Sequence, residues 1–194
     1  MTLTAILPSL RRSIPDPLAA VRWPVGTSAT TTDLRVGAVS LVALAAERGT
    51  ACTVTAAAVE PGSSGRASAT ARTSALVLRI LAVAPATDDA PRAMLVDADI
   101  AGLACTWEEA RLIGRASTAA ARPARIGGAD VRLPADVVAG DLVVVPVPGA
   151  VEVRGIRVVD ASAPVVVPGA AARLASAPVR VEVPVSVRAL SVAR

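Results

Sequence analysis

The carboxylates of the segment VDAD are the residues best placed to do chemistry, since Asp97 and Asp99 stand two positions apart. On a β-strand this spacing puts both side chains on the same face. Joined by Glu108 or Glu109, they would offer the oxygen ligands that Mg²⁺ or Ca²⁺ prefers. Short Asp-x-Asp matches are common by chance, so we interpret the pair as a solvated strand face. We predict no metal site.

Other catalytic groups are scarce. The chain has no His, Lys or Tyr, so Ser-His-Asp, Cys-His and Ser-Lys arrangements cannot form. The segment IGGAD lacks the glycine spacing of a phosphate-binding loop, and no Lys exists to serve one. We therefore expect a protein that is not an enzyme and needs no cofactor. A metal-assisted hydrolase built on the carboxylates is a minor alternative.

Two cysteines, Cys52 and Cys105, complete the reactive residues. A single disulfide between them is one alternative. The favoured interpretation is that both are buried thiols acting as small hydrophobic side chains.

The helices and strands that hold these residues are built from an unusual amino-acid composition. Hydrophobic residues make up 53% of the chain, yet Trp23 and Trp107 are its only aromatic residues. A core of Ala, Val and Leu buries less apolar area per residue than one with Phe and Tyr. We expect a lone protomer to be marginal and to gain stability by homo-oligomerisation.

Apolar runs and charge exclude several classes. The longest runs stop at Glu47 and at Arg79, far short of the roughly 20 residues that cross a bilayer. The N-terminus places Arg11 and Arg12 after its apolar stretch, the wrong order for a secretory signal. We expect a soluble, unexported protein with no membrane partner. The net charge is +4 but the Arg residues are dispersed, so any nucleic acid contact is expected to be non-specific.

Residues 1–28 form the first region. Four prolines interrupt it and leave room for only a short helix around SLRRSI, which predicts an extended N-terminal arm. Such arms often lie on another surface. Trp23 either anchors the arm on a neighbouring protein or makes a satellite contact on its own domain. Both alternatives stay open.

Residues 29–130 predict a β-rich domain with two short helices. The first helix covers residues 40–48, with Ser40 as N-cap and Gly49 just past its end. The second follows a capping box at Thr106 and Glu109 and ends at Gly114. Around them we expect a loop at 60–73 and strands at the following places: 33–39, 50–59, 74–84 and an antiparallel partner at 92–100.

Residues 131–194 predict strand after strand in the same fold. Pro148-Gly149 is expected to turn a hairpin, and Gly155 suits a bulge in its second strand. The segment VRVEVPVSVRALSV then alternates apolar and polar residues. Its apolar face consists of Val179, Val181, Val183, Val185 and Val187. This strand either pairs with a neighbouring subunit or closes its own sheet. The fold class we predict is mainly β, a sandwich or small barrel.

Three segments carry a resemblance: RWPVGTSATTTDLRVGAVSLVAL, EARLIGRAST and LPADVVAGDLVVVPVPGAV. Each is similar to stretches of virion structural proteins of tailed phages that infect GC-rich actinobacteria. The resemblance implies a non-enzymatic assembly protein, either a capsid decoration protein or a component of the head–tail junction. In addition, PVGTSATTTDL resembles the PxGTxxTxxDL turn of β-clip domains, found in pilus-assembly factors and in some phage decoration proteins.

The sequence therefore predicts a virion structural protein, made in the host cytoplasm and assembled in many copies with itself and with capsid or connector proteins. The expected interface comprises the arm residues Arg11, Arg12 and Trp23 and the valines of residues 179–187. The alternative is a host β-domain that acts as an adaptor or binding module.

Overall fold

A computed structural model describes residues 2–151 and 157–158 of the 194-residue chain. Its helices and 3₁₀ turns are α1 (Leu3–Ile6), η1 (Pro8–Arg12), η2 (Ala20–Arg22), α2 (Leu41–Arg48) and η3 (Trp107–Glu109). Its strands are β1 (Thr27–Ala29), β2 (Leu34–Val36), β3 (Val39–Ser40), β4 (Cys52–Val59), β5 (Ala67–Ala84), β6 (Arg92–Val96), β7 (Ala98–Asp99), β8 (Arg111–Ile113), β9 (Ala121–Ile126), β10 (Ala129–Pro134), β11 (Leu142–Pro148) and β12 (Arg157–Val158).

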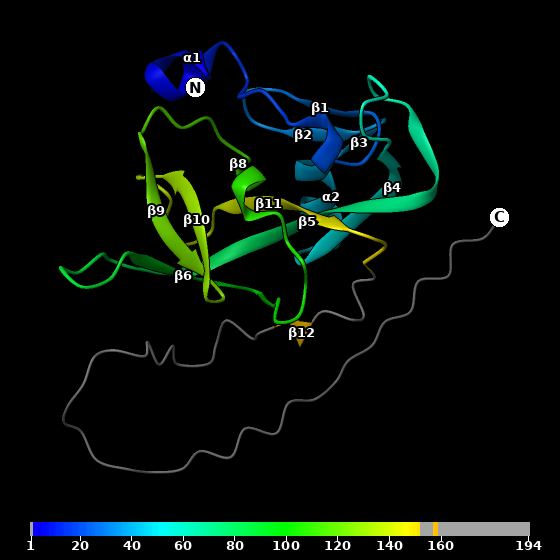
Figure 1. Cartoon of the computed structure of the whole chain (residues 1–194). Coiled ribbons are helices and arrows are strands. Elements are labelled where there is room, and N and C mark those ends of the chain that lie inside the picture. The colour runs from blue at the N-terminus through cyan, green and yellow to red at the C-terminus, as the bar shows by residue number, and fades with distance from the viewer. Residues whose placement is uncertain (1, 152–156, 159–194) are drawn as a thin grey trace. The chain divides into compact units, whose positions relative to one another are not determined.

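The main sheet is organised around the long strand β5 (Figure 1). One edge of β5 takes β4 along its first part and β6 along its last part, while the other edge takes β11. Beyond these neighbours, β6 pairs in parallel with β9, β9 with β10, and β11 with β8. The end strands β8 and β10 lie close to each other without pairing. The predicted mainly β fold is confirmed, and its sheet is a nearly closed barrel.

Both faces of β5 are buried, which explains why its sequence is a continuous apolar run. Leu76, Leu78 and Ile80 point into the barrel core, together with alternate valines of β11. Ala75 and Val77 point the other way, into a second apolar layer. That layer lies under α2, β2 and Trp23. A strand between two apolar layers needs no polar alternation.

The predicted helix at residues 40–48 is confirmed as α2. The Ser40 hydroxyl accepts a hydrogen bond from the Ala43 amide at 3.0 Å, as an N-cap does. Asp33 adds to the cap, because its carboxylate accepts from the Ser40 hydroxyl at 2.6 Å and from the Val42 amide at 3.1 Å. The strands β1, β2 and β3 form a separate three-stranded sheet that leads into this helix.

The helix predicted at TWEEARLIG is wrong. Only the 3₁₀ turn η3 forms there, and the Thr106 side chain makes no capping bond. The chain then enters β8, which pairs with β11 and buries Ile113. Pairing with an apolar strand and burial of Ile113 override the local capping signal, a common outcome for short elements.

Two further boundaries differ from the prediction. The expected loop at 60–73 is a turn only as far as Arg66, since β5 already begins at Ala67 and pairs with β4. The expected hairpin after Pro148 is not found among the described residues. Strand β12, which lies near the end of the expected second strand, pairs with β7 and not with β11. Gly155 lies outside the described residues.

The N-terminal segment, residues 2–22, consists of short turns and irregular chain around α1, η1 and η2. Residues 131–151 contribute β10 and β11 to the same sheet as the strands before them. No helix among the described residues is long and apolar enough to cross a membrane.

Candidate assembly surface

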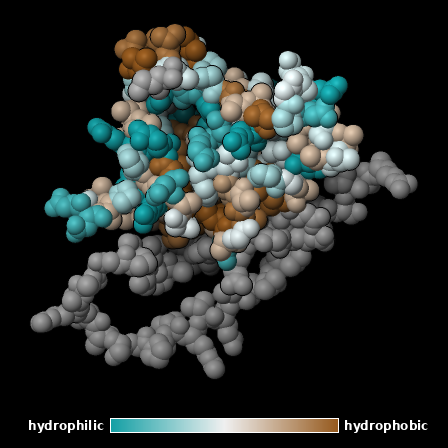
Figure 2. Space-filling model, in the orientation of Figure 1, coloured by the Kyte–Doolittle hydropathy of each residue, from teal (hydrophilic) through white to brown (hydrophobic). Residues whose placement is uncertain are grey.

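Helix α1 exposes its large apolar side chains and buries a polar one, the reverse of the usual distribution. Leu3, Ile6 and Leu7 are 66%, 60% and 52% exposed, whereas Thr4 is only 2% exposed. Spacings of three and four residues place the three apolar side chains on one face of the helical turn. We call Leu3, Ile6 and Leu7 the apolar row. Figure 2 shows hydrophobic atoms gathered where Figure 1 draws α1.

The chain stops the helix immediately after this row. Leu7 has φ −122° and ψ 82°, outside the helical region, because the proline ring of Pro8 disfavours a helical residue before it. The turn η1 follows and buries no residue. Farther along the N-terminal segment, Ile14 and Val21 are also exposed. The segment thus presents apolar side chains to solvent from its first helix to η2.

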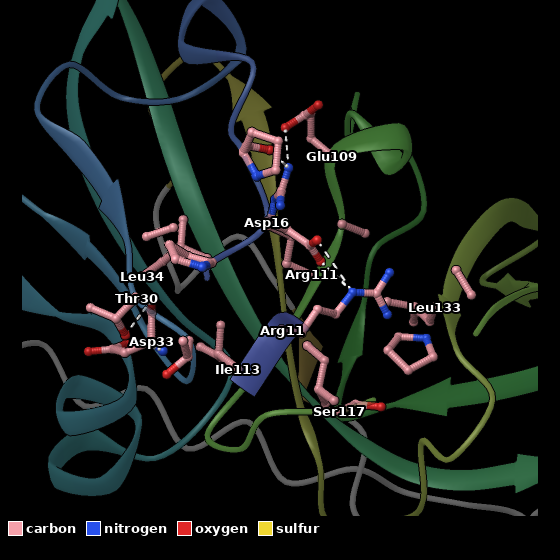
Figure 3. A pocket seen from close by; sticks show the side chains of 18 of the residues that line it. Arg11, Asp16, Thr30, Asp33, Leu34, Glu109, Arg111, Ile113, Ser117 and Leu133 are labelled. Atoms are coloured by element: carbon pink, nitrogen blue, oxygen red, sulfur yellow. Dashed lines mark hydrogen bonds and ion pairs between the residues drawn. The ribbon is translucent and has the colours of Figure 1, made fainter. Parts of the chain in front are cut away.

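A groove of about 330 Å³ lies beside η1, where the barrel fails to close (Figure 3). One side is lined by Arg111, Leu112 and Ile113 of β8, and the other by residues 132–134 of β10. We call this gap between β8 and β10 the seam. Residues of the N-terminal segment lie across it, including Arg11 and Asp16. Neither β8 nor β10 pairs with another described strand on this side, so their backbone groups can bind another chain segment there.

Polar contacts hold the N-terminal segment over the seam. The Arg11 guanidinium donates to the Ala119 carbonyl at 2.9 Å and forms an ion pair with Asp16 at 3.0 Å. Figure 3 shows the Arg11 and Asp16 side chains pointing toward each other over the groove. Arg111 donates to the Pro17 carbonyl at 2.5 Å. These contacts are all polar: each is a hydrogen bond or an ion pair made by an Arg guanidinium.

Glu109 is the polar centre of this region. One of its carboxylate oxygens, Oε2, accepts hydrogen bonds from the Trp23 indole at 3.0 Å, from Arg111 at 3.2 Å and from the Ala19 amide at 3.3 Å. The Arg111 Nε atom is buried and has no partner among the described residues. Glu109 therefore joins the root of the N-terminal segment to the start of β8.

Substitution of Glu109 by Ala is expected to lower the free energy of unfolding by about 1–3 kcal/mol, because the buried Trp23 indole and the Arg111 guanidinium lose a partly buried acceptor. The neighbouring Glu108 is exposed and makes no hydrogen bond to described residues, so Glu108→Ala is the matched control and is expected to change stability by less than about 0.5 kcal/mol. Urea denaturation of both variants measures the difference. Equal losses would contradict the role of Glu109.

A second polar cluster ties the loop after β8 to the loop after β10. Arg115 forms two hydrogen bonds with the Asp141 carboxylate, at 2.9 and 2.7 Å, and one with Asp136 at 3.1 Å. The Ser117 hydroxyl donates to Asp136 at 2.6 Å. Burial alone would raise the pKa of Asp136, but the hydrogen bonds from Ser117 and Arg115 and the charge of Arg115 outweigh it and hold the pKa below its usual value.

The Asp136 carboxylate gives a pH prediction. Its pKa is lower in the folded protein than in the unfolded chain, so its contribution is complete above about pH 4 and is lost as the pH falls through the folded pKa. We expect Asp136→Asn to flatten this part of the stability profile, measured by urea denaturation between neutral and acidic pH. Asp130→Asn, at an exposed position of β10, is the control. A profile unchanged by Asp136→Asn would contradict the prediction.

The two cysteines are free. Cys52 is buried in the layer under α2, and Cys105 is half-buried against the barrel core. Burial raises the pKa of the Cys105 thiol to about 11. Burial, with a smaller contribution from the nearby Asp97, raises the pKa of the Cys52 thiol to about 11 as well. Both are therefore protonated near neutral pH and are poor nucleophiles.

The prediction that Asp97 and Asp99 share a strand face is wrong. A break separates β6 from β7 at Asp97, which is buried, while Asp99 is exposed. The Asp97 carboxylate accepts from the Arg79 amide at 2.9 Å, and its own amide donates to the Arg79 carbonyl at 3.1 Å. Asp97 thus supports the irregular pairing of β5 with β6. Residues 2–151 contain no cluster of three carboxylates or thiols that could hold a metal ion.

The structure separates the residues predicted for the interface. Arg11 is mostly buried at the seam, Arg12 is exposed on η1, and Trp23 is fully buried in its own chain. Trp23 therefore makes the contact on its own domain, one of the two alternatives left open. The valines of residues 179–187 lie outside the described residues.

Sequence reasoning missed the apolar row, Glu109 and Arg111. The row had a signal, because Leu3, Ile6 and Leu7 have the spacing of one helical face before Pro8. The sequence indicates Glu109 only as part of a helix cap or as a possible metal ligand beside Asp97 and Asp99. Nothing local in the sequence indicates that it would accept a bond from Trp23, since the two residues meet only through the fold.

Comparison with known proteins finds no matching family model, no matching curated protein and no matching solved structure.

Proposed function

We propose that the protein is a non-enzymatic structural protein that assembles in many copies, as a capsid decoration protein or a head–tail junction component of a tailed phage. The observation that carries the proposal is the apolar row of α1. A helical turn that buries Thr4 and exposes Leu3, Ile6 and Leu7 has its apolar face turned toward a partner. The partner is a second copy of this chain.

The magnitude of the effect is sufficient for association. Full burial of one fully exposed Leu or Ile side chain stabilises by about 1.5–3 kcal/mol. Because the three side chains are 52–66% exposed, the row offers roughly 3–5 kcal/mol per protomer. Part of this free energy is offset by the translational and rotational entropy that the copies lose on association. The small side chains of the core also favour association, because a protomer without Phe or Tyr gains stability from apolar area buried between subunits.

The state of the reactive groups supports a non-enzymatic role. The thiols of Cys52 and Cys105 have pKa values of about 11, and Arg11, Arg111 and Arg115 bond to carboxylates or backbone carbonyls nearby. Such groups are occupied in holding the fold together. The virion assignment rests on the resemblance of three sequence segments to phage structural proteins, and the mainly β fold is compatible with it.

Sedimentation velocity of the intact chain over a wide range of concentration tests the assembly. A defined oligomer supports the proposal, whereas a monomer at every concentration contradicts it and favours a host binding module with a different partner. The position of the gene tests the virion assignment separately. A neighbouring portal or major capsid gene supports it, and a position among host metabolic genes contradicts it.

A further inference from the structure

A second pocket lies at one end of the barrel and shares no lining residue with the groove at the seam. It has a volume of about 600 Å³ and lies where the loop at residues 85–91 meets the start of β6, the start of β9 and the residue after β10. Figure 1 shows this loop projecting beyond β6. Ligand pockets commonly have volumes of roughly 300–1,000 Å³, and the mouth of a barrel is a frequent place for them. The pocket is therefore large enough for a small organic molecule.

Arg92 places a buried positive charge in this pocket. It is 8% exposed and continues the inward alternation of Met94 and Val96 along β6. Its guanidinium donates to the Leu133 carbonyl at 2.5 Å and to the Ala135 carbonyl at 3.2 Å. A guanidinium has five N–H groups, so these two bonds leave Nε and one hydrogen on each terminal nitrogen without an acceptor among the described residues.

The charge of Arg92 is not paired with any carboxylate of the described residues. Buried charges in proteins are normally paired, because the loss of hydration is otherwise uncompensated. Burial lowers the pKa of Arg92, and the charge of Asp136 only partly offsets this effect. Asp136 is itself bonded to Ser117 and Arg115. An anion bound in the pocket would neutralise the charge of Arg92.

Arg122, near the start of β9, adds a second positive charge to the pocket. Its side chain is exposed and forms no hydrogen bond or ion pair with a described residue. Arg125 lies three residues farther along the same strand, on the opposite face, where it forms an ion pair with Asp130 at 3.1 Å. Arg122 is therefore free to bind an anion, whereas Arg125 is not.

The rest of the pocket combines apolar walls with an acidic opening. The apolar lining includes Val83, Pro85, Pro91 and Pro123. Asp88 and Asp89 also line the pocket, from the exposed part of the loop. Water and salt screen exposed charges such as theirs much more than a buried charge such as that of Arg92. An anion that reaches Arg92 is therefore attracted more strongly than it is repelled.

We propose that this pocket binds a small organic carboxylate with an apolar body. The carboxylate accepts hydrogen bonds from Arg92 and Arg122, and the apolar body lies against Val83 and the prolines. Hydrogen bonds between a guanidinium and a carboxylate are among the strongest in proteins, because both groups are charged. This binding does not depend on assembly through the apolar row, which belongs to α1.

The test is isothermal titration calorimetry of the intact protein with octanoate as the probe. Octanol has the same apolar chain without the charge, and inorganic phosphate has charge without an apolar body. We expect octanoate to bind, and octanol and phosphate to bind at least about tenfold more weakly. Octanol that binds as tightly as octanoate would overturn the role of the arginines. Phosphate that binds as tightly would indicate an inorganic anion site and overturn the organic ligand.

Three variants locate the binding. Arg122→Met is expected to weaken octanoate binding about two- to tenfold, and Arg92→Met at least about tenfold, because a buried charged donor contributes more. Arg125→Met, on the other face of β9, is the matched control and is expected to leave binding unchanged. Circular dichroism checks that each variant folds. Because Arg122 and Arg125 are both exposed, their comparison decides the matter even if Arg92→Met does not fold.

Two further results would overturn the proposal. One is octanoate binding of equal strength in Arg122→Met, in Arg125→Met and in the unaltered protein. The other is no binding of octanoate at millimolar concentration.

Discussion

Replacement of Trp23 by Ala is expected to lower the free energy of unfolding by about 3–5 kcal/mol, the range for truncating a large buried aromatic side chain. Trp23 is 0% exposed and packs in the layer between α2 and the outer face of the sheet. The substitution leaves a cavity there and removes the indole that donates to Glu109 at 3.0 Å. In a protein with so few large side chains, such a loss approaches the whole stability of an ordinary domain.

Two further variants separate the causes. Trp23→Phe keeps an aromatic ring but removes the donor, so it is expected to cost less than Trp23→Ala. Trp107→Ala is the matched control, because Trp107 is only partly buried against the barrel core. Urea denaturation followed by circular dichroism avoids dependence on tryptophan fluorescence. If Trp107→Ala destabilised the protein more than Trp23→Ala, the position of Trp23 as the root of the N-terminal segment would be wrong.

The triple variant Leu3→Ser, Ile6→Ser and Leu7→Ser is expected to weaken self-association about 10²-fold. Even at the lower end of about 1.5 kcal/mol for a fully exposed side chain, a row that is 52–66% exposed contributes roughly 3 kcal/mol. Each 1.4 kcal/mol corresponds to a factor of ten in the dissociation constant. The free energy of unfolding of the protomer is expected to change little, because all three side chains are already exposed in it.

The matched control for the triple variant is Val138→Ser. Val138 is 56% exposed, in the loop after β10, and belongs neither to α1 nor to the seam. It should leave association unchanged in sedimentation equilibrium. A triple variant that associates as tightly as the unaltered protein would show that the apolar row is not an interface. One that unfolds would mean that the row packs within its own chain.

The sequence predicted the elements whose local and long-range preferences agree. The segment SALVLRILAVA is apolar throughout and becomes the core part of β5, buried on both faces. Ser40 and Gly49 bound a helix that also packs its apolar face on the sheet, so the capping signal and the packing lead to the same structure. The mainly β fold followed from many such segments.

The prediction failed where packing overrides local preference. Thr106 and Glu109 have the spacing of a helix cap, but Ile113 is buried by the pairing of β8 with β11, and Glu109 serves Trp23 instead. The alternation of Asp97 and Asp99 assumed an uninterrupted strand, and the break at Asp97 removes it. A contact such as that from Arg11 to Ala119 joins residues far apart in the chain and leaves no local pattern.

Hydrogen–deuterium exchange of the intact protein, compared above and below the concentration at which it associates, tests the central claim most directly. It needs no substitution, and it reports on the peptide that contains α1 and η1. We predict that backbone amides of this peptide exchange more slowly in the assembled protein, while those of the loop at residues 85–91 are unchanged. Slowed exchange elsewhere, with unchanged exchange in α1 of an oligomeric sample, would contradict assembly through the apolar row.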